Sequence, residues 1–168
     1  SLFYNGHYCR NVAKRYSIDR RAQQDFSILS HQKAHEAQVQ GKFKNEITKI
    51  NDCDIDGGIR ANSNHEILDS LKVIFDENGT VTAATSSPLT DGAATVLVCE
   101  EQYAKDNNLE ILGRIVSTAV EGCDPDYMGL GPIEASRKAL KRANLSIKDI
   151  DIIELNEAFA SQSVSYTH

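Results

Sequence analysis

The sequence predicts an α/β fold, and two observations support this prediction. From residue 110 onward, apolar runs typical of buried strands alternate with stretches of helical periodicity, in the order strand, helix, strand, helix. Hydrophobic residues make up 40% and charged residues 25% of the 168 residues, which fits a globular chain that can bury a core. No apolar run is long enough to span a membrane, so no membrane partner is expected.

The first half of the chain is predicted to be mainly helical. Residues 9–16 can form a short helix. A longer helix begins after Ser17, which is placed to act as its N-cap, and ends at Gly41. Residues 43–50 alternate well enough for a strand. Residues 51–58 are a turn-rich acidic loop, and residues 59–79 are mixed and close with the turn sequence "DENG".

Strands and helices are expected to alternate in the rest of the chain. A helix over 101–108 separates two strand systems and marks the best candidate boundary between two halves. Pro132 suits the first turn of a later helix, which Asn144 can end, and the last helix begins at about Glu157. The apolar runs predicted as strands cover residues 80–85, 93–99, 110–120 and 151–155.

Charge and cysteine content argue against several classes of function. The formal net charge is -6 and no basic block is present, so nucleic-acid binding is not expected. The cysteines have no CxxC spacing, so neither a zinc site nor a disulfide framework is expected, and a reducing compartment fits better. These residues are Cys9, Cys53, Cys99 and Cys123.

Two clusters have some features of metal sites, but no metal is predicted at either. The segment "DCDIDGGI" (52–59) spaces its aspartates like a calcium loop, but Ser63 stands where a bidentate Glu is required. His31 and His35 are four residues apart on a predicted helix, and no third ligand has a supporting spacing. A solvated turn and a solvent-facing helix are the simpler interpretations.

Two polar segments leave alternatives open. Asn156 stands where a predicted buried strand meets a helix, in "ELNEAFASQ". Its amide can cap that helix, or it can point into a site, because ligands in α/β folds bind where strands end. The segment "TSSPLTDGAA" (85–94) places hydroxyls between two apolar runs, which fits either an ordinary turn or a site for an amide-bearing ligand.

Three segments taken together closely resemble the thiolase family, the acyl-CoA C-acyltransferases. They occur in the family's order and at compatible spacing, and "RNVAKRYSIDRRAQQDF" and "GKFKNEI" extend the resemblance over nearly the whole chain. The three segments are "GTVTAATSSPLTDGAA", "RIVSTAVEGCDPDYMGLGPIEASRKAL" and "ELNEAFASQ".

The resemblance implies a duplicated core of two layered αβαβα halves, here incomplete, with part of an inserted loop domain. Residues 1–102 would be the C-terminal part of the thiolase N-terminal domain, with the loop domain at about 1–78 and the last strand at about 80–99. Residues 109–168 would begin the C-terminal domain. The resemblance also implies a homodimer or homotetramer for the full-length protein. Its location would be intracellular, either the cytoplasm or the mitochondrial or peroxisomal matrix.

Thiolases transfer an acyl group between coenzyme A and a second acyl-CoA through a covalent cysteine thioester. The resemblance thus implies thiolytic cleavage of 3-ketoacyl-CoA or Claisen condensation of acetyl-CoA, with acyl-CoA and coenzyme A as partners and no further cofactor. Two alternatives stay open: a related decarboxylating condensing enzyme, and a non-enzymatic module that binds or assembles around CoA esters.

The resemblance assigns five site residues. Asn156 matches the family Asn that holds a water, and this water, with a histidine from another motif, stabilises the thioester oxyanion. Met128 and Phe159 match residues that line the pantetheine and acyl pocket. Ser87 matches a serine that contacts the pantetheine arm, and Arg60 an arginine beside the adenine nucleotide.

The departures from the family pattern concern the covalent chemistry. None of the four cysteines matches the nucleophile, and the Gly-His-Pro motif and the second cysteine are expected after residue 168. The chain begins with Ser1 rather than Met. We therefore expect an internal fragment that holds pocket residues and is inactive by itself.

Overall fold

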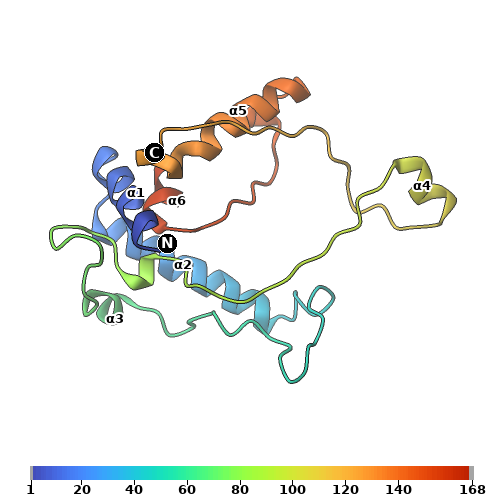
Figure 1. Cartoon of the computed structure of the whole chain (residues 1–168). Helices are drawn as coiled ribbons and strands as arrows, with labels where there is room; N and C mark the ends of the chain where they lie inside the picture. Colours follow the sequence, from blue (N-terminus) through green and yellow to red (C-terminus); the bar gives the residue numbers. More distant parts are fainter. Residues whose placement is uncertain (1, 167–168) are drawn as a thin grey trace.

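The computed structural model describes the backbone of residues 2–166 and the side chains of residues 8–166. Two long helices, α1 (Leu2–Arg15) and α2 (Arg20–Val39), form its first part (Figure 1). Asp19 caps α2, because its Oδ1 accepts the Ala22 N–H at 2.7 Å. The predicted cap at Ser17 is wrong, because Ser17 occupies the left-handed region (φ 55°) in the link between the helices, whereas an N-cap needs an extended backbone.

Shorter helices follow along the chain. The helices predicted over 101–108 and 132–143 are present, and Asn144 ends the second in the left-handed conformation (φ 56°), as expected. The elements are α3 (His65–Asp69), η1 (Ala83–Thr85), α4 (Glu101–Asp106), η2 (Pro125–Leu130), α5 (Gly131–Ala143), η3 (Ile147–Asp149) and α6 (Ala160–Ser165). In the described residues, no helix is long and apolar enough to cross a membrane.

The runs predicted as strands do not pair into a sheet. Between residues 2 and 166 the only β-type contacts are isolated antiparallel bridges, Ile50 with Cys53, Val73 with Thr82 and Ser86 with Phe159. A strand needs a neighbour about 4.7–4.9 Å away, which β-propensity alone cannot supply. The strand predictions for 43–50 and 80–85 are therefore wrong, because turns occupy 41–46 and η1 occupies 83–85. The runs 93–99, 110–120 and 151–155 are extended without a paired neighbour in the described residues.

The core lies where α1, α2 and α6 meet (Figure 1). Buried Ala13, Ile18 and Val164 form its centre, with Ala22 and Phe26 packed against them. A hydrogen bond also joins the first helix to the last, because the buried Ser161 Oγ donates to the Cys9 carbonyl at 3.2 Å. Residues from the two ends of the described chain thus stabilise the same cluster.

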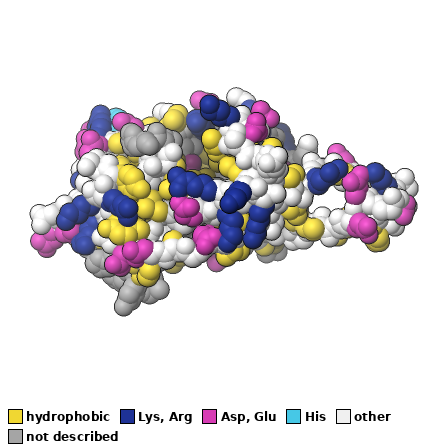
Figure 2. Space-filling model, turned by 90° about the horizontal axis from the view of Figure 1, so that it is seen from above, with side chains coloured by type: hydrophobic (Ala, Val, Ile, Leu, Met, Phe, Trp, Pro, Cys, Tyr) yellow, Lys and Arg dark blue, Asp and Glu magenta, His cyan; other side chains and the backbone are white. Residues whose placement is uncertain are grey.

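The extended runs leave this core, reach α4 and return (Figure 1). We call residues 89–124 the arm. Most of its large apolar side chains face solvent: Val96 is 81% exposed and Leu112 is 89% exposed. Its end near residues 117–121 is tied to α5, where Ser117 Oγ donates to the Ala139 carbonyl at 2.7 Å and Lys138 Nζ donates to Glu121 Oε2 at 2.6 Å. Figure 2 shows the α4 end projecting from the body, on which hydrophobic side chains are visible between charged ones.

Candidate functional site

Three distant segments enclose a cavity of about 380 Å³ beside the core. One wall is α2, the second is η1 with the turn that follows it, and the third is the extended run that leads into α6. The lining is mostly polar, and the residues that matter below are Ser30, His31, Ser86, Ser87, Asn156 and Glu157. The volume falls in the range of small-molecule sites, roughly 300–1,000 Å³.

A backbone contact brings Ser87 and Asn156 to the same cavity. The Ser87 N–H donates to the Ala158 carbonyl at 2.8 Å, beside the bridge between Ser86 and Phe159. Both bridge residues are extended, with φ/ψ of -129°/136° and -143°/137°, which lets the two segments run antiparallel over this short contact. Two of the five predicted site residues therefore share one cavity.

Asn156 does not cap a helix. α6 begins at Ala160 with Phe159 at the N-cap, so the predicted start at about Glu157 is wrong. A capping side chain must belong to the N-cap residue, because only there can it reach the free N–H groups of the first turn. Asn156 lies earlier, in extended chain, and its exposed amide lines the cavity. The alternative that its amide is a helix cap is therefore wrong.

Two neighbouring residues of α2 hold the segments around this cavity. Ser30 Oγ donates at 2.6 Å to Oε2 of Glu157, the residue that follows Asn156 in the chain. The Arg60 backbone N–H donates to His31 Nδ1 at 3.2 Å, which places Arg60 beside the cavity although it is not among the lining residues.

Sequence reasoning missed Ser30 altogether and considered His31 only as half of a metal pair with His35. A signal was present, because Ser27, Ser30 and His31 follow the spacing that places polar side chains on one helix face. Nothing in the sequence indicates that this face meets the chain near Asn156.

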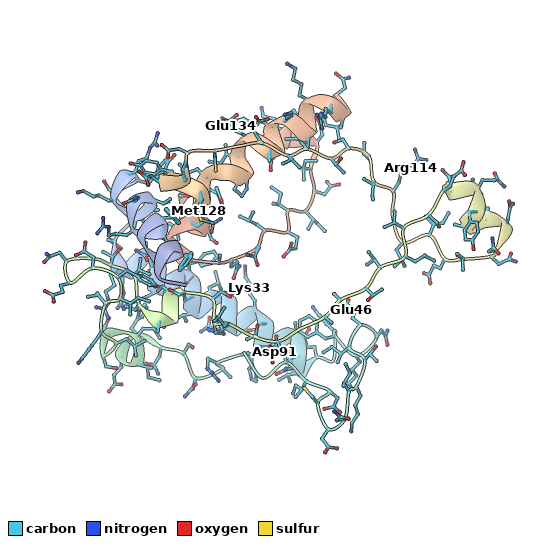
Figure 3. The ribbon with its side chains drawn as sticks, viewed as in Figure 1. Lys33, Glu46, Asp91, Arg114, Met128 and Glu134 are labelled. Carbon is cyan, nitrogen blue, oxygen red and sulfur yellow. The ribbon has the colours of Figure 1, made fainter. Side chains whose placement is uncertain are left out.

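Met128 and Phe159 are placed differently. Phe159 is half-buried at the start of α6, next to the cavity. Met128, which is 45% exposed, lies on η2, close to where α5 begins, and does not line the cavity (Figure 3). The η2 turn is held against α1, since Asn11 Nδ2 donates to the Asp126 carbonyl at 3.1 Å and the Arg15 guanidinium lies 4.8 Å from the Tyr127 ring centre.

The cysteines contribute no nucleophile to this cavity. Burial raises the pKa of the Cys9 thiol to about 12, so this side chain stays protonated near neutral pH, and only a thiolate is a good nucleophile. Cys53, Cys99 and Cys123 are exposed, and none of them lines the cavity. The described residues contain no group of three or more His, Cys, Asp or Glu that could hold a metal ion. The cavity can therefore bind and polarise a ligand through amide, hydroxyl and backbone groups.

Comparison with known proteins gives matches along nearly the whole chain. Residues 3–102 match the family described as "Thiolase, N-terminal domain", and residues 109–168 match "Thiolase, C-terminal domain". The 3-ketoacyl-CoA thiolase of Shewanella loihica is 49% identical over 163 residues, 91% of this chain and 42% of that protein. The corresponding protein of Photobacterium profundum is 48% identical over the same shares. The chain spans about two fifths of the length of these curated relatives.

Solved structures match the path of the backbone as well. The acetyl-CoA acetyltransferase of Bacillus anthracis superposes with a TM-score of 0.88 at 36% identity, over 95% of this chain and 43% of that one. Human mitochondrial 3-ketoacyl-CoA thiolase in complex with CoA gives a TM-score of 0.89 at 37% identity, over 94% of this chain and 41% of that one. Such coverage includes most of the extended arm.

Proposed function

The chain belongs to the thiolase family, and from this premise we propose that it supplies part of the CoA-ester site of an acyltransferase. The reaction would be thiolytic cleavage of 3-ketoacyl-CoA or condensation of acetyl-CoA. One observation carries the proposal: Ser87 and Asn156, which lie in the two separately matched thiolase domains, line one cavity.

We further propose that the described segments are parts of a layered αβαβα core, divided into domains at about residues 102–109. The TM-scores of 0.88 and 0.89 support this, because the extended runs follow the course of solved thiolases. In that arrangement 93–99, 110–120 and 151–155 become strands once neighbouring segments pair with them. A homodimer or homotetramer of a full-length protein remains a proposal drawn from the family.

Each side chain would act by binding or by polarisation. The Asn156 amide orients a water toward the thioester oxygen, where negative charge develops, and as a neutral group it adds no competing charge. Ser87 Oγ hydrogen-bonds the pantetheine arm, and the Arg60 guanidinium pairs with the nucleotide phosphates. Phe159 and Met128 provide apolar surface toward the acyl group and pantetheine. The substrates would be acyl-CoA and coenzyme A, with no further cofactor.

The covalent step requires a thiolate, and in the described part of the chain no cysteine lines this cavity. We therefore assign these residues to substrate binding and to stabilisation of the oxyanion.

A chimera tests the proposal. In it, this chain replaces the matching 163 residues of the Shewanella loihica 3-ketoacyl-CoA thiolase. We expect CoA-dependent cleavage of acetoacetyl-CoA, and a loss of kcat with Asn156→Ala. A folded chimera that binds CoA without turnover would instead favour a non-enzymatic CoA-binding module.

A further inference from the structure

Two adjacent residues of α2 contact the two segments that carry Asn156 and Arg60. Ser30 and His31 both line the cavity, but their hydrogen bonds go to different partners. Ser30 Oγ donates to the Glu157 carboxylate at 2.6 Å, while His31 Nδ1 accepts the Arg60 backbone N–H at 3.2 Å. One turn of a long helix thereby fixes two segments that lie far apart in the sequence.

The contact made by Ser30 bears on the orientation of Asn156. Within the described part of the chain, no hydrogen bond holds the Asn156 side chain itself, so its direction depends on the backbone around it. That backbone is fixed after Asn156 at two points, the Glu157 carboxylate and the Ala158 carbonyl. Without the first contact, the Glu157 side chain no longer anchors the residue next to Asn156, and the backbone bond at Ala158 holds the segment.

The contact made by His31 bears on Arg60. Arg60 lies in a turn-rich, exposed stretch, where the Ser63 N–H donates to the Arg60 carbonyl at 3.1 Å. The bond to His31 ties this turn to α2, and it requires an unprotonated Nδ1 because the imidazole acts as the acceptor. Arg60 is exposed, and its backbone is anchored to α2 by this bond.

We propose that Ser30 and His31 are positioning residues with separate tasks: Ser30 orients Asn156 through Glu157, and His31 holds Arg60 where it meets the nucleotide of CoA. This inference rests on the proposed function. It assigns Ser30 to the chemical step and His31 to CoA binding. If the helix had only a structural role, substitutions at the two residues would not affect kcat and the KM for CoA separately.

Steady-state kinetics of the chimera test this separation. Ser30→Ala is expected to lower kcat about three- to tenfold with the KM for CoA nearly unchanged. His31→Leu is expected to raise the KM for CoA by a similar factor, about three- to tenfold, with kcat nearly unchanged. Both bonds are exposed, so larger effects are not expected.

Conservative variants should restore each function. Ser30→Thr keeps the hydroxyl, so its kcat should stay near that of the unsubstituted chimera. His31→Asn places an amide oxygen near the position of Nδ1, so its KM for CoA should stay near that of the unsubstituted chimera. Lys33→Ala is the matched control, because Lys33 is an exposed residue of the same helix and does not line the cavity (Figure 3).

Two further variants of the chimera, Asn156→Ala and Arg60→Ala, separate failure of this inference from failure of the proposed function. If Asn156→Ala lowers kcat and Arg60→Ala raises the KM for CoA while Ser30→Ala and His31→Leu do neither, the positioning role is overturned and the site stands. It is equally overturned if both α2 variants change kcat and KM together along with the melting temperature. If Asn156→Ala and Arg60→Ala are themselves without effect, the proposed function fails, and the positioning role fails with it.

Discussion

The helical corner formed by α1, α2 and α6 differs from the arm over residues 89–124 in what happens to its apolar side chains. In the corner, apolar side chains such as Val12 (0% exposed) find partners within the chain. In the arm, side chains of the same type, such as Leu112 (89% exposed), face solvent. Both regions carry apolar side chains, so their different exposure comes from the presence or absence of a neighbouring segment. Burial, and the stabilisation that follows from it, belongs to pairs of segments.

The largest expected difference is in catalysis. The purified 168-residue chain should show no thiolysis of acetoacetyl-CoA, whereas the chimera should be active. Loss of a catalytic nucleophile typically costs on the order of a millionfold in rate, and no cysteine lines the cavity in the described residues. A spectrophotometric thiolysis assay decides this, and turnover by the chain well above a no-protein control would contradict it.

Hydrogen exchange should separate the two regions within the isolated chain. Amides of 93–99 and 110–120 should exchange within seconds because they lack ladder partners, while the interior of α2 is expected to be protected by orders of magnitude. The exposed apolar arm should also promote aggregation, visible by size-exclusion chromatography. A monomer with a sharply cooperative unfolding transition and a protected arm would show that the arm is ordered without further partners.

Substitution of Asn156 in the chimera should have the next largest effect. Asn156→Ala should lower kcat about a hundredfold, the lower end of the cost of an oxyanion donor, because in the proposed role the amide acts through a water. Asn156→Asp should be worse, because it places a carboxylate near developing negative charge. The assay is kcat with the melting temperature as a check on folding, and near-normal kcat for Asn156→Asp would exclude a role at the oxyanion.

The smallest effect concerns stability and compares the two regions directly. In the isolated chain, Val12→Ala should lower the free energy of unfolding by about 1–2 kcal/mol, whereas Leu112→Ala should change it by less than about 0.5 kcal/mol. In the chimera, where the arm would be covered, Leu112→Ala should cost about 2–5 kcal/mol. Urea unfolding of these three variants and of their two unsubstituted parents measures this, and equal costs for Leu112→Ala in both contexts would mean that the arm stays uncovered.

The sequence by itself determined the elements that depend on local chemistry, and it indicated the family. Pro132 and Asn144 mark the two ends of α5 as predicted, because proline restricts the backbone at a helix start and asparagine tolerates the left-handed turn at its end. The thiolase resemblance rested on three segments in order, and the matches to residues 3–102 and 109–168 confirm it.

Only the tertiary structure decided the features that depend on a second segment. The β-rich runs are extended but unpaired, because a ladder needs a partner that local propensity cannot provide. The meeting of Ser87 with Asn156 could be expected only through the resemblance, and the contacts of Ser30 and His31 were not predicted at all. Residues so far apart in the sequence become neighbours only when the core at α1, α2 and α6 closes, because hydrophobic burial is non-directional and leaves no local mark of which polar groups it brings together.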